Sequence, residues 1–131
     1  MPTRLVPALA LLVAVSAGCG SDPAPAASDG GGGEPSAELA SVIADAQRMA
    51  PALESALRGT DYPTTIEGAQ QALDAAGLAP SDGNVVGGYR YEADVVEFVL
   101  CIEGPTGAFA SYDTRPMSLF ENGETGGCPD S

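Results

Sequence analysis

Apolar residues in the stretch 36–58 recur at helical spacing, and this pattern predicts the first helix of the chain. They form one broad stripe made of Leu39, Val42, Ile43, Ala46, Met49, Ala50, Leu53, Ala56 and Leu57. Ser36 is a suitable amino-terminal cap, and Gly59 follows the pattern as a helix stop. Pro51 lacks a backbone donor, so we expect it to kink the helix near Ala50 or divide it there. One apolar stripe is typical of a core face; a surface that fills a partner's groove is the alternative.

A second helix is predicted over residues 64–76. The stretch from Thr64 to Glu67 fits a capping box, in which the Thr64 hydroxyl accepts a hydrogen bond from the Glu67 amide and the Glu67 side chain accepts one from the Thr64 amide. The apolar stripe of this helix consists of Ile66, Ala69, Leu73 and Ala76. Gly77 should end the helix, and Pro80 prevents its continuation.

After a turn at residues 81–84 the apolar residues alternate, which indicates strands. We expect strands over 85–91, 95–103 and 108–113, and an irregular tail over 114–131. The face of the middle strand that should meet the helices is wholly apolar: Val96, Phe98, Leu100 and Ile102. The opposite face is mixed and should be half-exposed: Val95, Glu97, Val99, Cys101 and Glu103. The predicted fold class is α+β, with two helices packed on a three-stranded, or slightly larger, antiparallel sheet.

Residues 1–18 have the pattern of a signal peptide. Arg4 supplies a positive charge, and the 13-residue apolar run 5–17, which Pro7 interrupts, is too short, at about 20 Å of helix, to span a membrane. The sequence Ser16-Ala17-Gly18-Cys19 resembles the lipobox of bacterial lipoproteins, which implies that Cys19 receives a diacylglyceryl group and becomes the new amino terminus. The alternative is an ordinary secretory signal, with Cys19 left free or removed.

A lipidated Cys19 would place the protein on the bacterial cell membrane, facing the extracytoplasmic side, with the membrane as its first partner. Residues 19–35 are rich in Gly, Pro, Ala and Ser, and we expect them to form a flexible tether. Residues 36–131 then form one small domain.

Composition excludes most catalytic chemistry. The chain has 131 residues, 18 acidic and 5 basic, with a formal net charge of −13, and it contains no His and no Lys. Imidazole bases, His-ligated zinc, Schiff bases and phosphate-binding lysines are therefore absent. A hydrolase with two carboxylates is the one catalytic class left, and no pattern places such a pair, so we expect no enzyme activity. Without a basic patch, we expect no binding to nucleic acid.

The remaining cysteines predict one structural disulfide. If Cys19 carries the lipid, Cys101 and Cys128 are an even pair in an oxidising compartment. A bridge between them would stabilise the fold by about 3–4 kcal/mol, because it would restrict the unfolded chain. Two free thiols are the alternative; a redox-active pair is disfavoured because there is no Cys-x-x-Cys spacing.

A short motif follows the first predicted helix and consists of Tyr62-Pro63-Thr64-Thr65, Gly68 and Ala72-Leu73. It resembles the start of the globular region of type II secretion major pseudopilins and type IV pilins. The resemblance implies a short antiparallel sheet, a carboxyl-terminal disulfide loop and protein partners. Pilins, however, begin with a long hydrophobic helix that builds the filament, whereas this chain has a lipobox and a tether. We therefore expect this chain to share the fold of these domains and their binding to protein partners, but not pilus assembly.

Two sets of residues are candidates for binding. Some major pseudopilins hold calcium near the carboxyl end, and the available oxygen ligands here are Asp113, Glu121, Asn122, Glu124 and Asp130. A solvated acidic tail is the alternative. Protein contacts, if the side chains are exposed, are best made by Tyr62, Tyr89, Tyr91 and Tyr112. We therefore expect a lipid-anchored, non-catalytic module that binds a protein partner and needs no cofactor. The alternative is a surface lipoprotein that binds calcium or a small ligand through the acidic tail.

Overall fold

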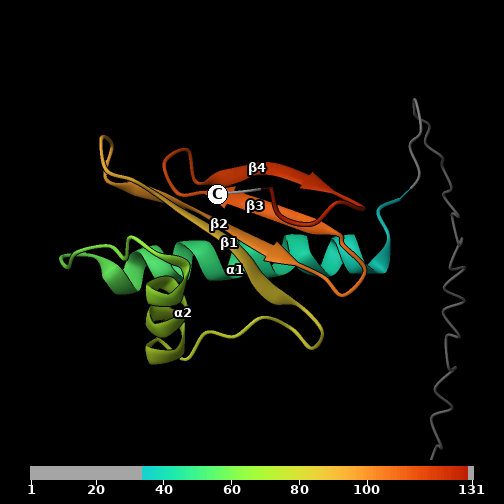
Figure 1. The fold of residues 1–131 in the computed structure, drawn as a ribbon, viewed down its shortest axis with the longest axis horizontal. Helices are drawn as coiled ribbons and strands as arrows, with labels where there is room; N and C mark the ends of the chain where they lie inside the picture. The colour runs from blue at the N-terminus through green and yellow to red at the C-terminus, as the bar shows by residue number, and fades with distance from the viewer. Residues whose placement is uncertain (1–33, 130–131) are drawn as a thin grey trace, which may run out of the picture. The chain divides into compact units, whose positions relative to one another are not determined.

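The computed structural model describes residues 34–129 (Figure 1). The predicted signal peptide, Cys19 and all but the last two residues of the predicted tether lie outside this range. The described chain forms two helices and four strands: α1 (Ala37–Leu57), α2 (Ile66–Ala75), β1 (Val85–Glu92), β2 (Glu97–Glu103), β3 (Phe109–Asp113) and β4 (Ser118–Gly123). In this part of the chain, no helix is long and apolar enough to cross a membrane.

Helix α1 lies along one face of the sheet and follows the predicted apolar stripe. Ser36 caps it, because its hydroxyl accepts a hydrogen bond from the Leu39 amide, and Gly59 follows its end with a φ of 85°. Pro51 does not divide the helix. Met49 and Leu53, on either side of Pro51, are both fully buried, so both halves stay packed on the sheet.

Helix α2 begins one residue later than the predicted capping box. The N-cap is Thr65 and not Thr64, and the Thr65 hydroxyl accepts a hydrogen bond from the Gly68 amide. The predicted role of Glu67 is therefore wrong, since the third residue after the true cap is Gly68, which has no side chain to reach back. The end is as predicted, with Gly77 at a φ of 71°.

The sheet has four antiparallel strands in the order β1-β2-β3-β4, where the sequence predicts three, although that prediction left room for a slightly larger sheet. The additional strand is β4, inside the stretch expected to be an irregular tail. Its side chains are largely exposed, so it lacks the apolar alternation that marks a strand. A register shift between Ser111 and Tyr112 disturbs the alternation further.

The two faces of the sheet are unequal. The helix face carries Phe98, Leu100 and Ile102, all fully buried against the helices, as predicted. Val96 was expected on this face, but it precedes β2 in a turn, has a φ of 55°, and is 59% exposed.

The face away from the helices is called the open face below. Val99, Cys101 and Glu97 are buried on it, so the prediction that this face is half-exposed is wrong for β2. Strands β1 and β3 flank β2 on both sides, and the segment that leads to Cys128 folds back against it.

The disulfide Cys101–Cys128 is present, as predicted, and joins β2 to the end of the described chain with Cα atoms 6.0 Å apart. The Glu103 carboxylate accepts a hydrogen bond from the Cys128 amide at 2.9 Å. Gly87 in β1 makes room for the bridge, because a Cβ atom at Gly87 would lie 2.7 Å from the Cys128 Sγ atom. The disulfide therefore fixes the carboxyl-terminal segment on the open face.

Two carboxylates fix the amino terminus of α1 to the sheet. Glu124, just after β4, accepts hydrogen bonds from the backbone amide and the hydroxyl of Ser36. Glu38 accepts bonds from the amide and the hydroxyl of Thr106 and from the Ala108 amide. These contacts place the β2–β3 turn and the end of β4 beside the point where the chain joins the domain.

Candidate functional site

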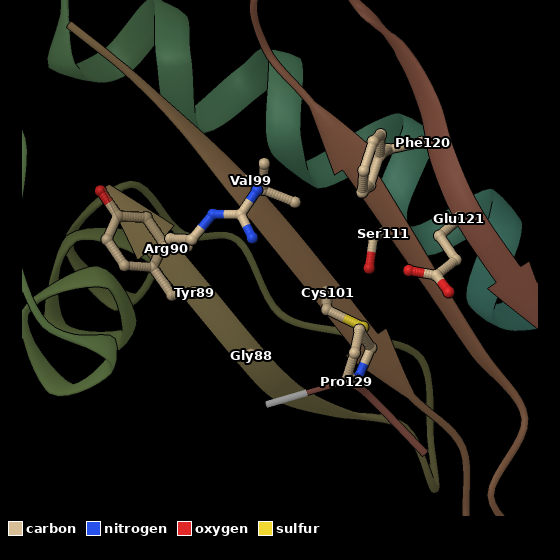
Figure 2. A pocket seen from close by; sticks show the side chains of 9 residues that line it. All are labelled: Gly88, Tyr89, Arg90, Val99, Cys101, Ser111, Phe120, Glu121 and Pro129. Carbon is tan, nitrogen blue, oxygen red and sulfur yellow. The ribbon is translucent and has the colours of Figure 1, made fainter. Parts of the chain in front are cut away.

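The open face contains a hollow of about 110 Å³ (Figure 2). Its lining comes from all four strands and from the carboxyl-terminal segment: Gly88, Tyr89, Arg90, Val99, Cys101, Ser111, Phe120, Glu121 and Pro129. Pockets for drug-sized ligands usually measure about 300–1,000 Å³. The hollow therefore suits a small molecule or one side chain.

The hollow combines an apolar floor with polar groups of three kinds. Val99 and the disulfide lie at the middle of the sheet, with Arg90 on one side and Glu121 on the other, as Figure 2 shows. Ser111 lies between them and is only 2% exposed.

The exposed members of this site are Arg90, Phe120, Glu121 and Pro129. The Arg90 guanidinium pairs with Glu92 at 2.9 Å, and both side chains are near half exposure, so the pair is weak and replaceable. Phe120 is 60% exposed at the irregularity of β4. Phe120 comes from β4 and Arg90 from β1, so the two side chains lie on opposite sides of the hollow.

A second candidate surface is formed by the turns 93–96 and 114–117, which we call the hairpin end. Both turns lie at the end of the sheet opposite the α1 amino terminus, because strands β2 and β4 both run from this end towards the contacts with Glu38 and Ser36. The turn 114–117 contacts the start of β2, which directly follows the turn 93–96. The Thr114 hydroxyl accepts a hydrogen bond from the Phe98 amide and donates one to the Phe98 carbonyl, and Arg115 lies 3.5 Å from Glu97.

The hairpin end exposes apolar side chains on a strained backbone. Val95, Val96 and Met117 are all exposed. Val96 and Met117 each directly precede a strand and have φ values of 55° and 56°, a conformation that glycine or asparagine adopts at lower cost. Strain of this kind in exposed apolar residues is typical of functional surfaces.

The buried Asp45 of α1 is structural. It is 2% exposed and accepts hydrogen bonds from the amide and hydroxyl of Ser81, from the Asn84 side chain and from Arg48, at 2.7–2.9 Å. Burial alone would raise the pKa of Asp45, but the hydrogen bonds outweigh it and lower the pKa below its usual value. The satisfied carboxylate holds the loop before β1 on the helix and is not available to a ligand.

The four tyrosines belong mainly to the core. Tyr89 and Tyr112 are buried. Tyr89 packs on Phe98 with ring centres 5.4 Å apart and donates a hydrogen bond to the Pro63 carbonyl, and burial raises the pKa of its hydroxyl. Tyr62 packs between Phe98 and Tyr91 and is half-buried, as is Tyr91. The Tyr-Pro-Thr-Thr motif is therefore the corner that docks the α1–α2 connection onto the sheet.

The calcium candidates are not brought together within the described residues. Glu124 is bonded to Ser36, Asp113 accepts a bond from the Arg115 amide, and Glu121 lies opposite Ser111 in the hollow. Asn122 is paired with Ala110, and Asp130 lies outside the described residues. Between residues 34 and 129, no group of three or more acidic, cysteine or histidine side chains is arranged to hold a metal.

Sequence reasoning assigned Tyr89, Cys101 and Glu121 to other roles and missed the remaining residues of the hollow. Arg90 carried a signal, because it is a rare cation at an outward position of an alternating strand. Phe120 follows a Pro-containing turn, which marks the start of a possible strand. Ser111 gave no signal, since its burial depends on the neighbouring strands.

Comparisons with protein-family models, with curated proteins and with solved structures found no match for this chain. The resemblance to pilins and pseudopilins therefore stays a prediction from the sequence.

Proposed function

We propose that this protein is a lipid-anchored, extracytoplasmic and non-catalytic protein that binds a protein partner through its hairpin end. The observation that carries the proposal is the exposure of Val95, Val96 and Met117 on two turns at the same end of the sheet. Apolar side chains gathered at one end of a small acidic domain favour a protein contact over a solvated surface.

The position of the hairpin end supports this function. The predicted tether joins the domain at Ser36, and α1 has 21 residues, which corresponds to a length of about 31 Å. The hairpin end lies at the opposite end of the sheet from Ser36. A partner can therefore reach it without meeting the attachment point. Cys19 supplies the attachment in this proposal, and its lipidation is tested separately.

The lipid anchor is tested by partitioning into detergent. Wild-type protein from cell membranes should enter the detergent phase of a Triton X-114 separation, and the Cys19→Ala variant should stay in the aqueous phase. Recovery of unmodified wild-type protein, with an intact Cys19 thiol, would contradict the anchor.

The partner surface is tested by site-specific photo-crosslinking in intact cells. A photoreactive phenylalanine analogue at Met117 should give one discrete crosslinked product, identified by mass spectrometry, and a Val96→Asn exchange should reduce it. Val85 is the matched control, because it is also an exposed apolar side chain but lies at the start of β1, away from both turns. Equal crosslinking from Val85 and Met117, or none from Met117, would remove the hairpin end as the contact surface.

A further inference from the structure

The hollow on the open face carries opposite charges on its two sides. Arg90 comes from β1 and Glu121 from β4, and the two edge strands are three strand spacings apart, about 14 Å between backbones. Both side chains line the same hollow, so each reaches inward over the sheet (Figure 2). From this arrangement we infer that the hollow binds a small zwitterion with an apolar side chain, of the size of a free amino acid.

The charges around the hollow disfavour a ligand that carries only negative or only positive charge. An anion would meet the carboxylates of Glu121 and Glu92 in a chain with a formal net charge of −13. A simple cation would meet the Arg90 guanidinium. A zwitterion matches both sides: its carboxylate pairs with Arg90, which has five N–H donors and uses only some of them on Glu92, and its ammonium group pairs with Glu121.

The remaining lining matches the rest of such a ligand. Ser111 is buried to 2% exposure, and its hydroxyl points into the hollow (Figure 2). A hydroxyl can donate a hydrogen bond to a ligand carboxylate or accept one from a ligand ammonium group. Val99 and the disulfide form the apolar floor, and the exposed Phe120 ring is placed to cover an aliphatic side chain.

The size of the hollow excludes a whole peptide. An engineered apolar cavity of about 150 Å³ holds one benzene molecule. The hollow measures about 110 Å³ and opens to solvent, so it accommodates an aliphatic amino acid in part and no peptide in full.

The test is a calorimetric titration of the full chain with L-leucine, N-acetyl-L-leucine and L-leucinamide. L-Leucine should bind with one site per chain, and each blocked form should bind at least about tenfold more weakly, because one charge is lost. Arg90→Gln and Glu121→Gln should each weaken L-leucine binding about tenfold or more, and Ser111→Ala about threefold.

Matched controls are Arg58→Gln and Glu67→Gln, which remove exposed charges from the helices and should leave binding unchanged. The inference is overturned if neither L-leucine nor L-valine binds at concentrations up to about 10 mM, if N-acetyl-L-leucine binds as well as L-leucine, or if the Arg90 and Glu121 variants bind like wild type. Circular dichroism of each variant establishes that it is folded. None of these outcomes bears on the crosslinking test of the hairpin end.

Discussion

At the scale of single residues, Asp45 shows how a charge is kept inside a small core. It lies within the apolar stripe of α1, next to Ala46, where an unpaired carboxylate would be strongly destabilising. Ser81, Asn84 and Arg48 together supply four hydrogen bonds. Because those donors face Asp45, removing the carboxylate leaves them without their acceptor.

We expect Asp45→Asn to lower the free energy of unfolding by about 3 kcal/mol, since the new amide group faces donors and the ion pair with Arg48 is lost. Urea denaturation at pH 7 measures the change. Asp74→Asn, on the exposed side of α2, is the matched control and should change stability by less than about 0.5 kcal/mol. Equal effects of the two exchanges would show that Asp45 is not specifically stabilising.

The cost of Asp45→Asn should shrink in acid. The hydrogen bonds lower the pKa of Asp45 in the folded state below its usual value of 3.8. Its contribution to stability is therefore complete above pH 3.8 and is lost as the pH falls through the folded-state pKa. Urea denaturation of wild type and variant at pH 7, about 4 and about 3 measures this, and a difference in stability that stays constant would contradict it.

At the scale of elements, turns and the disulfide decide where the strands lie. The two turns of the hairpin end place a valine and a methionine in the left-handed region, and both strands that follow start directly after them. The disulfide holds the carboxyl-terminal segment over β2, and Gly87 is the position that allows the close approach.

We expect Val96→Asn to raise the free energy of unfolding by about 0.5–1 kcal/mol, because asparagine adopts a positive φ at lower cost than a β-branched residue. Thermal denaturation measures the gain. Val95→Asn is the neighbouring control, which has no positive φ and should give no gain. If Val96→Asn is more stable than wild type but no longer crosslinks to the partner, the strained conformation of Val96 contributes to binding. A loss of stability in Val96→Asn would disprove the strain.

The double exchange Cys101→Ser and Cys128→Ser should lower stability by about 3–4 kcal/mol, because the bridge closes a loop with a sequence separation of 27 residues. Denaturation of wild type with and without a phosphine reductant should reproduce this difference. If the reductant changes nothing in protein shown by mass to be oxidised, the bridge is not a main source of stability.

At the scale of the whole molecule, general screening of the negative charge by cations must be distinguished from calcium binding at a specific site. The net charge of −13 makes any divalent cation stabilising to some degree, because screening reduces repulsion among carboxylates. A specific calcium site would stabilise the folded state further, because calcium would bind the folded chain in preference to the unfolded one. Of the candidate ligands, Asp113 accepts a bond from the Arg115 amide, Glu124 is bonded to Ser36, and Glu121 lines the hollow.

We therefore expect calcium and magnesium at equal concentration to raise the melting temperature equally. Differential scanning fluorimetry after treatment with a chelator measures both. A larger shift with calcium, abolished by Glu121→Gln, would restore the calcium-binding alternative.

The sequence predicted the parts of the fold that depend on local pattern. The stripe of α1, the cap at Ser36 and the core side chains of β2 follow from spacing and composition alone. Strand β4 was missed because it is an exposed edge strand with little apolar alternation. The hollow was missed because Arg90, Ser111 and Glu121 come from three strands, and only the strand order and register bring them to one place.

The two carboxylates at the start of α1 also determine how the domain responds to force. Any pull on the chain ahead of Ser36 acts first on the hydrogen bonds to Glu124 and Glu38, which tie the first helical turn to the end of β4 and to the β2–β3 turn. The helix cannot be peeled away from its end until these bonds break. Hydrogen bonds from Ser36 and Thr106 lower the pKa of both carboxyls, so acid weakens the same contacts. Mechanical resistance at this end of the domain should therefore fall in acid.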